Sequence, residues 1–253
     1  MSINQIKICK PQMILCDIEG TTTSIDFVKK ILFPFFIKNL EEFLQNKQND
    51  QLIQNCLNNL IEQFANFEKN PQEKFNDFER LKIFKKFDDI VRFIQWLVEK
   101  DYKLTSLKQL QQFVWTKGYN VGVLKGHVYE DVPRCFQRWR SMGIKIGIYS
   151  SGSIEAQKLL FSTTRFGDLN SFIQYNFDTN IGSKMDPKSY YKIAEKVNLS
   201  PSEILFLTDI IQEAEAAHKT TMNVFVVERG TNLNQSDGFK TIESFEDINF
   251  HRE

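Results

Sequence analysis

The chain has 253 residues, of which 42% are hydrophobic and 13% aromatic, enough for a substantial core and unlike a disordered composition. Lysine plus arginine equals aspartate plus glutamate, 32 against 32, so charge gives no reason to expect nucleic acid or an anionic membrane as a partner. The first dozen residues lack the apolar run of a signal peptide, and no apolar stretch approaches the length of a membrane span.

Four short apolar runs predict buried parallel strands, because each is bounded by polar residues and is partly β-branched or aromatic. They are residues 13–16, 144–150, 204–207 and 224–227. Helical patterns lie between or after them, at residues 132–142, 153–161, 187–197 and 212–219. Alternating strands and helices predict an α/β fold, a Rossmann-like open sheet with right-handed crossovers, whose chemistry lies at the C-terminal strand ends.

A glycine-free stretch from Thr21 to Lys117 interrupts this pattern, and ten of the 11 glycines lie at Gly118 or later. Residues that are hydrophobic except for Lys85 recur within the stretch at helical spacing, in the sets Phe78, Leu81, Phe84, Lys85 and Ile90, Phe93, Ile94, Leu97. The polar run at 46–51 is typical of a loop. We therefore predict a core domain of residues 1–24 and 126–253, with an inserted all-helical cap domain at residues 25–125.

The strongest candidate for chemistry is DIEGTT, which begins at Asp17 directly after the first predicted strand. Asp17 and Glu19 are two residues apart, so their side chains share a face if the strand continues. A carboxylate nucleophile needs an electrophile that tolerates anionic attack, and a phosphoryl group beside a cation meets this need. Aspartate followed by glycine is also ordinary in a loop after a strand, which is the simpler explanation.

Asp209 follows the third predicted strand and would bring a third carboxylate to the same edge as Asp17 and Glu19. Two like charges about 4 Å apart repel by roughly 4 kcal/mol at an effective dielectric near 20. Protons or a metal ion must relieve this repulsion. Oxygen-only ligands beside a phosphate substrate favour Mg²⁺.

Three further signals each have a functional and a structural explanation. SSGS, residues 150–153, lies between a strand and a helix, where hydroxyls and amides can hold a phosphate, or Ser153 only caps the helix. Lys184 can neutralise a phosphate and the nucleophile together, or it is a solvated surface lysine. Glu213, four residues after Asp209, can support the site or only favour the first turn of its helix.

The order of these signals, acid pair, serine, lysine and acid, is the motif order of haloacid dehalogenase-like phosphatases. The segments DIEGTTTSIDFVKKILFPF, YSSGSIEAQKLLF and ILFLTDIIQEAEAA resemble the enolase-phosphatase family, also called acireductone synthases, of methionine salvage. SLKQLQQFVW in the insert and SKMDPKSYYKIA around Lys184 also resemble it. The resemblance covers nearly the whole chain, and glutamate at the second acidic position is typical of this family.

The resemblance implies a role for each matching residue. Asp17 would be the nucleophile and a Mg²⁺ ligand, and Glu19 the acid/base residue whose backbone carbonyl also binds the metal. Asp209 would complete the Mg²⁺ shell, with Glu213 supporting it. The substrate phosphate would be held by Ser150, Ser151 and Lys184, and Lys184 would also pair with the nucleophile.

The family's substrate is 2,3-diketo-5-methylthiopentyl-1-phosphate, a small phosphorylated molecule. It is enolised and then dephosphorylated to 1,2-dihydroxy-3-keto-5-methylthiopentene, through an aspartyl-phosphate intermediate. The resemblance also implies a soluble monomer in the cytoplasm, with some members in the nucleus as well, and no nucleic-acid or membrane partner.

One departure from the family pattern and two alternative functions accompany this resemblance. Where the family has an Arg-Pro-Gly-Asn turn, this chain has Arg229, Gly230, Thr231 and Asn232, so we expect the loop with a changed turn type. One alternative is another capped phosphatase that acts on a sugar or a short organic phosphate. A second alternative is a non-catalytic binding protein, which predicts loss of Asp17, Lys184 or Asp209, yet all three are present.

The remaining metal-ligand and stacking candidates are interpreted structurally. The three histidines, His127, His218 and His251, show no metal-ligand spacing. The four cysteines, Cys9, Cys16, Cys56 and Cys135, show no CxxC spacing, so we interpret them as reduced thiols. Trp96 and Trp115 are assigned to the core of the insert, and no substrate contact is assigned there.

Overall fold

The computed structural model describes residues 6–67, 87–230 and 238–251. Contacts divide the chain into two compact units, an α/β unit of Met1–Val28 with Leu124–Glu253, and a helical unit of Lys29–Val123. The first boundary lies a few residues later than the 24/25 division drawn from the sequence. The reason is a short helix, α1 (Ile25–Phe27), whose buried Phe27 stacks on His127 with ring centroids 5.8 Å apart.

Six strands of the described residues form one sheet in the order β4-β3-β2-β5-β6-β7, and each adjacent pair is parallel. They are β2 (Met13–Cys16), β3 (Lys145–Tyr149), β4 (Tyr175–Phe177), β5 (Ile204–Thr208), β6 (Asn223–Val227) and β7 (Lys240–Ile242). The predicted α/β fold with a parallel sheet is confirmed. The chain runs from β2 outward to β3 and β4, then returns to the other side of β2 at β5, so the strand order reverses at β2.

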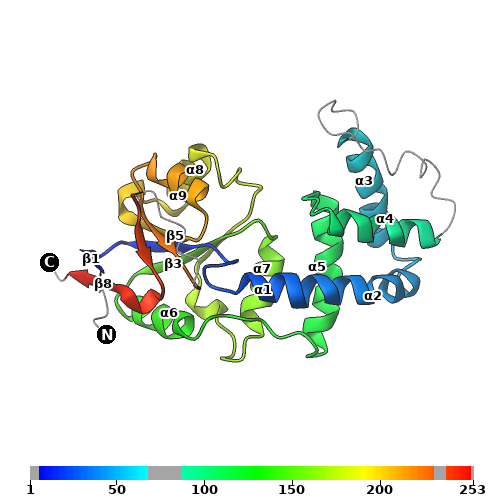
Figure 1. The fold of residues 1–253 in the computed structure, drawn as a ribbon, viewed down its shortest axis with the longest axis horizontal. Coiled ribbons are helices and arrows are strands. Elements are labelled where there is room, and N and C mark those ends of the chain that lie inside the picture. The colour runs from blue at the N-terminus through cyan, green and yellow to red at the C-terminus, as the bar shows by residue number, and fades with distance from the viewer. Residues whose placement is uncertain (1–5, 68–86, 231–237, 252–253) are drawn as a thin grey trace. The chain divides into compact units, whose positions relative to one another are not determined.

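Four of these strands match the apolar runs of the sequence, whereas β4 and β7 were not predicted. Each of those two has only three residues, YNF and KTI, with polar side chains among them. A separate parallel pair, β1 (Ile6–Cys9) with β8 (Ile248–His251), was also not predicted (Figure 1). Strands this short carry too little hydrophobic pattern to be read without their neighbours.

Helices cover both faces of the sheet, with α8 and α9 on one face and α6 on the other (Figure 1). The bounds are α6 (Asp131–Ser141), α7 (Ile154–Ser162), α8 (Pro187–Val197) and α9 (Ile211–His218), each within about one residue of its predicted range. Met13 and Leu15 of β2 join the cluster on the face of α8 and α9. Because side chains alternate along a strand, Ile14 and Cys16 point to the opposite face, and all four are fully buried.

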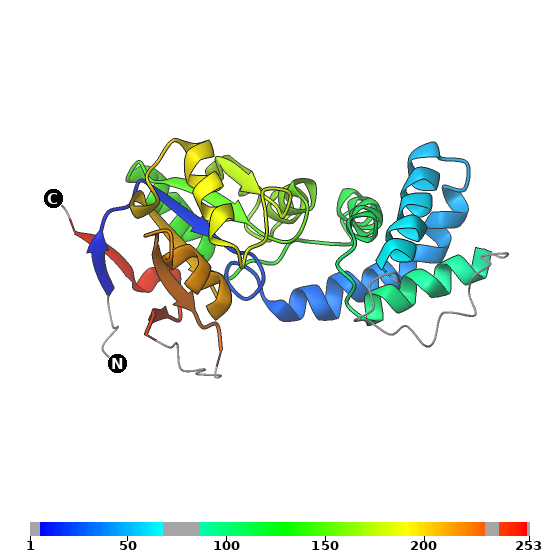
Figure 2. The ribbon, with the colours of Figure 1, turned by 90° about the horizontal axis from the view of Figure 1, so that it is seen from above.

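The helical unit consists, in the described residues, of α2 (Phe33–Asn46), α3 (Gln51–Phe67), α4 (Phe87–Glu99) and α5 (Thr105–Asn120), shown from above in Figure 2. The residues between α2 and α3 form the predicted loop. Trp96 and Trp115 pack against the unit's core, and the indole nitrogen of Trp115 donates to the carbonyl of Leu32 at 2.9 Å. The helical spacing at Phe78 to Lys85 lies outside the described residues.

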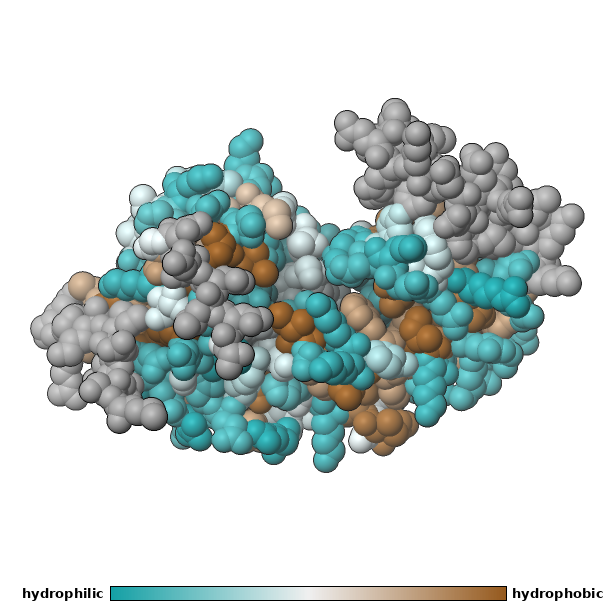
Figure 3. Space-filling model, in the orientation of Figure 1, coloured by the Kyte–Doolittle hydropathy of each residue, from teal (hydrophilic) through white to brown (hydrophobic). Residues whose placement is uncertain are grey.

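The surface seen in Figure 3 is mainly hydrophilic, with hydrophobic residues in small patches. Large exposed hydrophobic side chains occur in both units, namely Ile25, Ile31, Leu52, Val121, Val123, Met142, Phe166, Met185 and Tyr191. Among the described helices, none is long and apolar enough to cross a membrane.

Candidate active site

The sheet brings three predicted site segments to one edge. Asp17 directly follows central β2, and its amide extends the ladder by donating to Leu207 of β5 at 2.9 Å. Ser150 follows β3 and donates its amide to Phe177 of β4 at 3.2 Å. Asp209 follows β5, on the other side of β2. These residues therefore surround the switch in strand order, where open α/β sheets bind ligands.

A tight turn fixes the backbone after Asp17. The carbonyl of Ile18 accepts three amides, those of Thr21 at 3.2 Å, Thr22 at 3.0 Å and Thr23 at 2.8 Å. The hydroxyl of Thr22 donates to the carbonyl of Asp17 at 3.1 Å. All three threonines are fully buried, so the turn is held from inside the α/β unit.

The expectation that Asp17 and Glu19 share a strand face is wrong, because β2 ends at Cys16 and Glu19 lies in the turn. The Asp17 side chain is buried, whereas Glu19 is exposed. Consistent with this, the described residues contain no group of three or more histidine, cysteine, aspartate or glutamate side chains arranged to hold a metal. The oxygen atoms that the turn contributes besides the side chains of Asp17 and Glu19 include backbone carbonyls and the buried hydroxyl of Thr21, and the family resemblance implies the carbonyl of Glu19 as a metal donor.

Asp209 packs directly against the turn. Gly20 has a φ of +73°, and a Cβ atom there would lie 2.1 Å from Oδ2 of Asp209, so only glycine leaves room for the carboxylate. Oδ1 of Asp209 is buried and has no hydrogen-bond partner among the described residues. Burial, and then the charge of Asp17, raises the pKa of Asp209 to about 7. A half-buried carboxylate with one unsatisfied oxygen, beside the buried carboxylate of Asp17, fits a hard divalent cation such as Mg²⁺.

Lys184 is a buried cation held between two carboxylates. Its Nζ lies 2.7 Å from Oδ1 of Asp17 and 2.7 Å from Oε2 of Glu213, and the lysine is 8% exposed. Burial alone would lower the pKa of Lys184, but the pKa is raised because the two carboxylate charges outweigh burial. The same Oε2 accepts the hydroxyl of Thr208 at 2.9 Å. The structure thus gives Glu213 a lysine as its partner, at the first turn of α9.

The segment after β3 combines a capped helix with a buried hydroxyl. Ser153 caps α7, since its Oγ accepts the amide of Ala156 at 3.2 Å, as the structural explanation of SSGS required. Oγ of Ser150 accepts the amide of Gly152 at 3.2 Å, and Ser150 is 4% exposed. Accepting that bond leaves the hydroxyl hydrogen of Ser150 able to donate to a phosphate oxygen. Ser151, half-buried, lies at the start of the same loop.

A cavity of about 510 Å³ opens at Gly20 and Asp209. Its remaining lining residues come from the α/β unit and are Ser24, Ile25, Asp26, Tyr129, Ile211, Val226, Val227, Glu228, Arg229 and Gly230. This volume lies in the range that holds small organic molecules. A space of the size of a small molecule therefore adjoins Asp209 and the turn after β2, whereas Asp17, Ser150, Ser151 and Lys184 are not among its lining residues.

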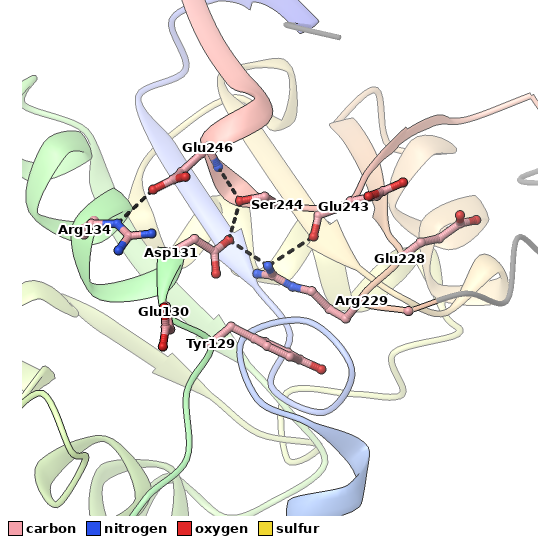
Figure 4. Close-up of a pocket in the computed structure, with 10 residues that line it drawn as sticks. Tyr129, Glu130, Asp131, Arg134, Glu228, Arg229, Glu243, Ser244 and Glu246 are labelled. Carbon is pink, nitrogen blue, oxygen red and sulfur yellow. Dashed lines mark hydrogen bonds and ion pairs between the residues drawn. The ribbon is translucent and has the colours of Figure 1, made fainter. Parts of the chain in front are cut away.

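Arg229 anchors the turn that follows β2. The sequence indicated Arg229 only as part of the changed turn at residues 229–232. Arg229 points to Asp131 in Figure 4, with Nη1 2.7 Å from Oδ2, and its Nε donates to the carbonyl of Thr21 at 3.0 Å. Its guanidinium carbon lies 4.4 Å from the ring centroid of Tyr129 and 4.7 Å from that of Phe245. Arg229 therefore links the turn after β2 to α6, while Thr231 and Asn232 lie outside the described residues.

The comparisons agree with this geometry. A model of the haloacid dehalogenase-like hydrolase family matches residues 11–219. Enolase-phosphatase E1 of Anopheles gambiae is 41% identical over 249 residues, covering 95% of this chain and 83% of the relative. The chain belongs to the enolase-phosphatase family of haloacid dehalogenase-like hydrolases.

Two further proteins extend the likeness across distant organisms. Enolase-phosphatase E1 of a Sulfurihydrogenibium species is 43% identical over 241 residues, covering 94% of this chain and 98% of the relative. The crystal structure of the UTR4 protein (Unknown transcript 4 protein) of Saccharomyces cerevisiae superposes with a TM-score of 0.74 at 31% identity, covering 94% of this chain and 99% of that one. The similarity therefore includes the helical insert as well as the α/β unit of this enolase-phosphatase family member.

Proposed function

We propose that this chain converts 2,3-diketo-5-methylthiopentyl-1-phosphate to 1,2-dihydroxy-3-keto-5-methylthiopentene and phosphate in methionine salvage. The observation that carries the proposal is the buried Lys184 with Nζ 2.7 Å from Asp17 at the strand switch point. A cation at this place holds the Asp17 carboxylate in position, and it can attract a phosphate dianion toward the same oxygen. Relatives named enolase-phosphatase E1, at about 40% identity over nearly the whole chain, support the choice of substrate.

In phosphoryl transfer, an Asp17 oxygen attacks phosphorus and the ester bond to the leaving oxygen breaks. Glu19 protonates that oxygen and then takes a proton from the water that attacks the aspartyl-phosphate, which regenerates Asp17 and releases phosphate. Its exposed position at the tip of the turn allows Glu19 to meet both substrate and water. Ser150, Ser151 and Lys184 donate hydrogen bonds to the phosphate oxygens throughout both steps.

The carboxylates of Asp17 and Asp209, with the backbone carbonyl of Glu19, would hold Mg²⁺. The ion would supply positive charge that neutralises the phosphate and any enolate oxygen close to it. The protein's part is to hold these oxygen donors in place, and the packing of Asp209 against Gly20 does this.

Enolisation precedes phosphoryl transfer in this proposal. The diketone makes the protons on the phosphate-bearing carbon acidic, and removal of one proton gives an enolate that is then protonated on oxygen. Lys184, Ser150 and Ser151 hold the phosphate end in both steps, so the intermediate need not leave between them. One site can therefore perform both reactions.

We also propose that residues 25–125 act as a cap that admits substrate and excludes water from the covalent intermediate. The division of the chain into two units supports this. The two chain segments that connect the units also support a cap. One is the π-helix η1 (Val28–Leu32), and the other contains Gly122 at a φ of +75°. Both are irregular backbone, of the kind that absorbs hinge rotation.

The proposal further places the protein in the cytoplasm as a monomer that acts on a small phosphorylated molecule. The free cysteines, Cys9, Cys16, Cys56 and Cys135, support a reducing compartment. The face seen in Figure 3 carries its hydrophobic residues in small patches, which supports the monomer. No observation supports a nuclear location.

The test is side-by-side turnover of the diketo phosphate and a hexose phosphate by the full chain, with and without Mg²⁺. We expect phosphate release from the diketo phosphate at a kcat/KM at least a hundredfold above that for the hexose phosphate, and its loss in excess chelator. The Asp17→Asn variant is the control for contaminating phosphatase. Equal or better turnover of the hexose phosphate would assign the chain to another capped phosphatase of the same superfamily.

A further inference from the structure

Four successive carbonyls lead up to and include that of Lys184, and each accepts a hydrogen bond from a different side chain. The bonds are Lys192 Nζ to Ile181 at 3.1 Å, Tyr149 hydroxyl to Gly182 at 3.0 Å, Ser189 hydroxyl to Ser183 at 2.7 Å and Tyr190 hydroxyl to Lys184 at 2.7 Å. Loop carbonyls usually accept hydrogen bonds from water or from backbone amides. Four successive side-chain donors therefore hold the backbone of residues 181–184 in place.

The donors come from two elements that flank the lysine. Tyr149 is the last residue of β3, directly before Ser150, and the other three donors lie on α8. The two tyrosines are fully buried and their rings meet edge to face, 5.7 Å apart at 81°. Burial raises the pKa of Tyr149 to about 12 and also raises the pKa of Tyr190, so both hydroxyls stay protonated and donate.

The loop before Lys184 also packs closely against α8 at Gly182. Gly182 has a φ of +149°, and a Cβ atom there would lie 2.1 Å from Oγ of Ser189. Nζ of Lys184 lies 5.8 Å from the ring centroid of Tyr149, so this tyrosine supports both the backbone before the lysine and its charged end.

We propose that Tyr149 and Tyr190 are positioning residues for Lys184. A lysine side chain has four flexible carbons, so its ammonium group is placed well only if the backbone that carries it is fixed. The tyrosine hydroxyls fix that backbone on both sides, which keeps Nζ at Asp17 when a phosphate arrives. Through Tyr149, the strand that presents Ser150 and the loop that presents Lys184 become one rigid phosphate-binding unit.

This inference rests on the proposed role of Lys184 in phosphoryl transfer. The test uses Tyr149→Phe and Tyr190→Phe in the full chain, since each removes one hydroxyl and keeps the ring. Tyr191→Phe is the matched control, because Tyr191 neighbours Tyr190 on α8 but is 52% exposed. Each positioning variant should lower kcat about tenfold with KM changed less than threefold, while the control stays within twofold of wild type.

A double-mutant cycle separates positioning from general stability. If the tyrosines act through Lys184, then Tyr190→Phe should leave single-turnover phosphate release unchanged when Lys184 is already methionine. A purely structural role predicts the same tenfold loss in both backgrounds, and that result would overturn the inference. Ser189→Ala, which removes the bond to Ser183 and the side-chain hydrogen bond with Tyr149, serves as the milder variant if a tyrosine variant does not fold.

A second readout does not depend on the substrate. The folded full chain is treated with an amine-reactive acylating reagent and then digested, and mass spectrometry of the peptides gives the rate of Lys184 acylation. This rate should be several-fold higher in Tyr149→Phe and Tyr190→Phe than in wild type or Tyr191→Phe. Equal acylation in all four proteins would contradict the positioning role. Failure of the wild type to hydrolyse the diketo phosphate would contradict the proposed function alone, because the acylation rates still decide the role of the tyrosines.

Discussion

The carboxylate of Asp209 lies against the backbone of Gly20 so closely that a Cβ atom on Gly20 would fall 2.1 Å from Oδ2. This contact joins the end of β5 to the turn after β2, and it places the half-buried carboxylate of Asp209 beside Asp17. Because Gly20 also has a φ of +73°, both space and backbone conformation demand glycine at this position.

We predict that Gly20→Ala displaces Asp209 and lowers phosphate release by at least about 10²-fold, since a shift of about 1 Å at a catalytic group costs this much. Gly143→Ala is the matched control, because Gly143 has a φ of +77° but nothing within 4 Å of an added Cβ. The control should lose about 1 kcal/mol of unfolding free energy and keep its activity. Equal activities in the two variants would show that the contact has no catalytic importance.

Lys184→Met should lower both the rate of phosphate release and the free energy of unfolding. The change leaves two buried carboxylates, Asp17 and Glu213, without the cation that lies 2.7 Å from each. Breaking a buried ion pair on one side costs about 3–5 kcal/mol. Urea unfolding measures the loss, and adding Glu213→Gln should recover part of it. An unfolding free energy equal to that of wild type would rule out the ion pairs as buried contacts.

The Arg229–Asp131 pair should matter for stability far more than an exposed pair of the same kind. Both side chains are over nine-tenths buried, and Arg229 lies between two aromatic rings. Arg229→Gln is expected to cost about 3–5 kcal/mol. Arg134→Gln, which breaks the exposed pair with Glu246, should cost about 1 kcal/mol or less. Thermal or urea unfolding of both variants measures the two losses of unfolding free energy. Similar losses would contradict the prediction that the buried pair contributes more to stability than the exposed pair.

Glu19→Gln should slow turnover by about 10² to 10⁴, the usual contribution of a positioned acid/base group. The side chain is exposed, so the free energy of unfolding should change by only about 0.5 kcal/mol. Single-turnover kinetics with labelled substrate separates the chemical step from binding, which should be largely intact. A variant as fast as wild type would exclude Glu19 as the acid/base residue.

The strands that carry the site could be predicted from the sequence, because each is a short apolar run ending in a polar residue. The turn after β2 could not, because its shape depends on Ile18 accepting three amides and on Asp209 packing against Gly20. The predicted face shared by Asp17 and Glu19 failed for this reason.

The supports of Lys184 were also beyond the sequence. The lysine itself could be singled out by its place among the acidic and serine motifs. Its pairing with Glu213, and the hydroxyls of Tyr149 and Tyr190 on the loop carbonyls, join residues from three separate elements. A tyrosine in a strand or helix is usually a core residue, so no local pattern distinguishes these two from others.

The central claim is that one site, with Asp17 as its nucleophile, both enolises and dephosphorylates the diketo phosphate. The most direct measurement is proton and phosphorus NMR of the reaction in deuterated water with Mg²⁺, for wild type and Asp17→Asn. We predict that wild type releases phosphate and yields the enolised product, whereas Asp17→Asn releases none but still exchanges the C1 protons for deuterium. Phosphate release by wild type with the diketone left un-enolised, or undiminished release by Asp17→Asn, would contradict the account.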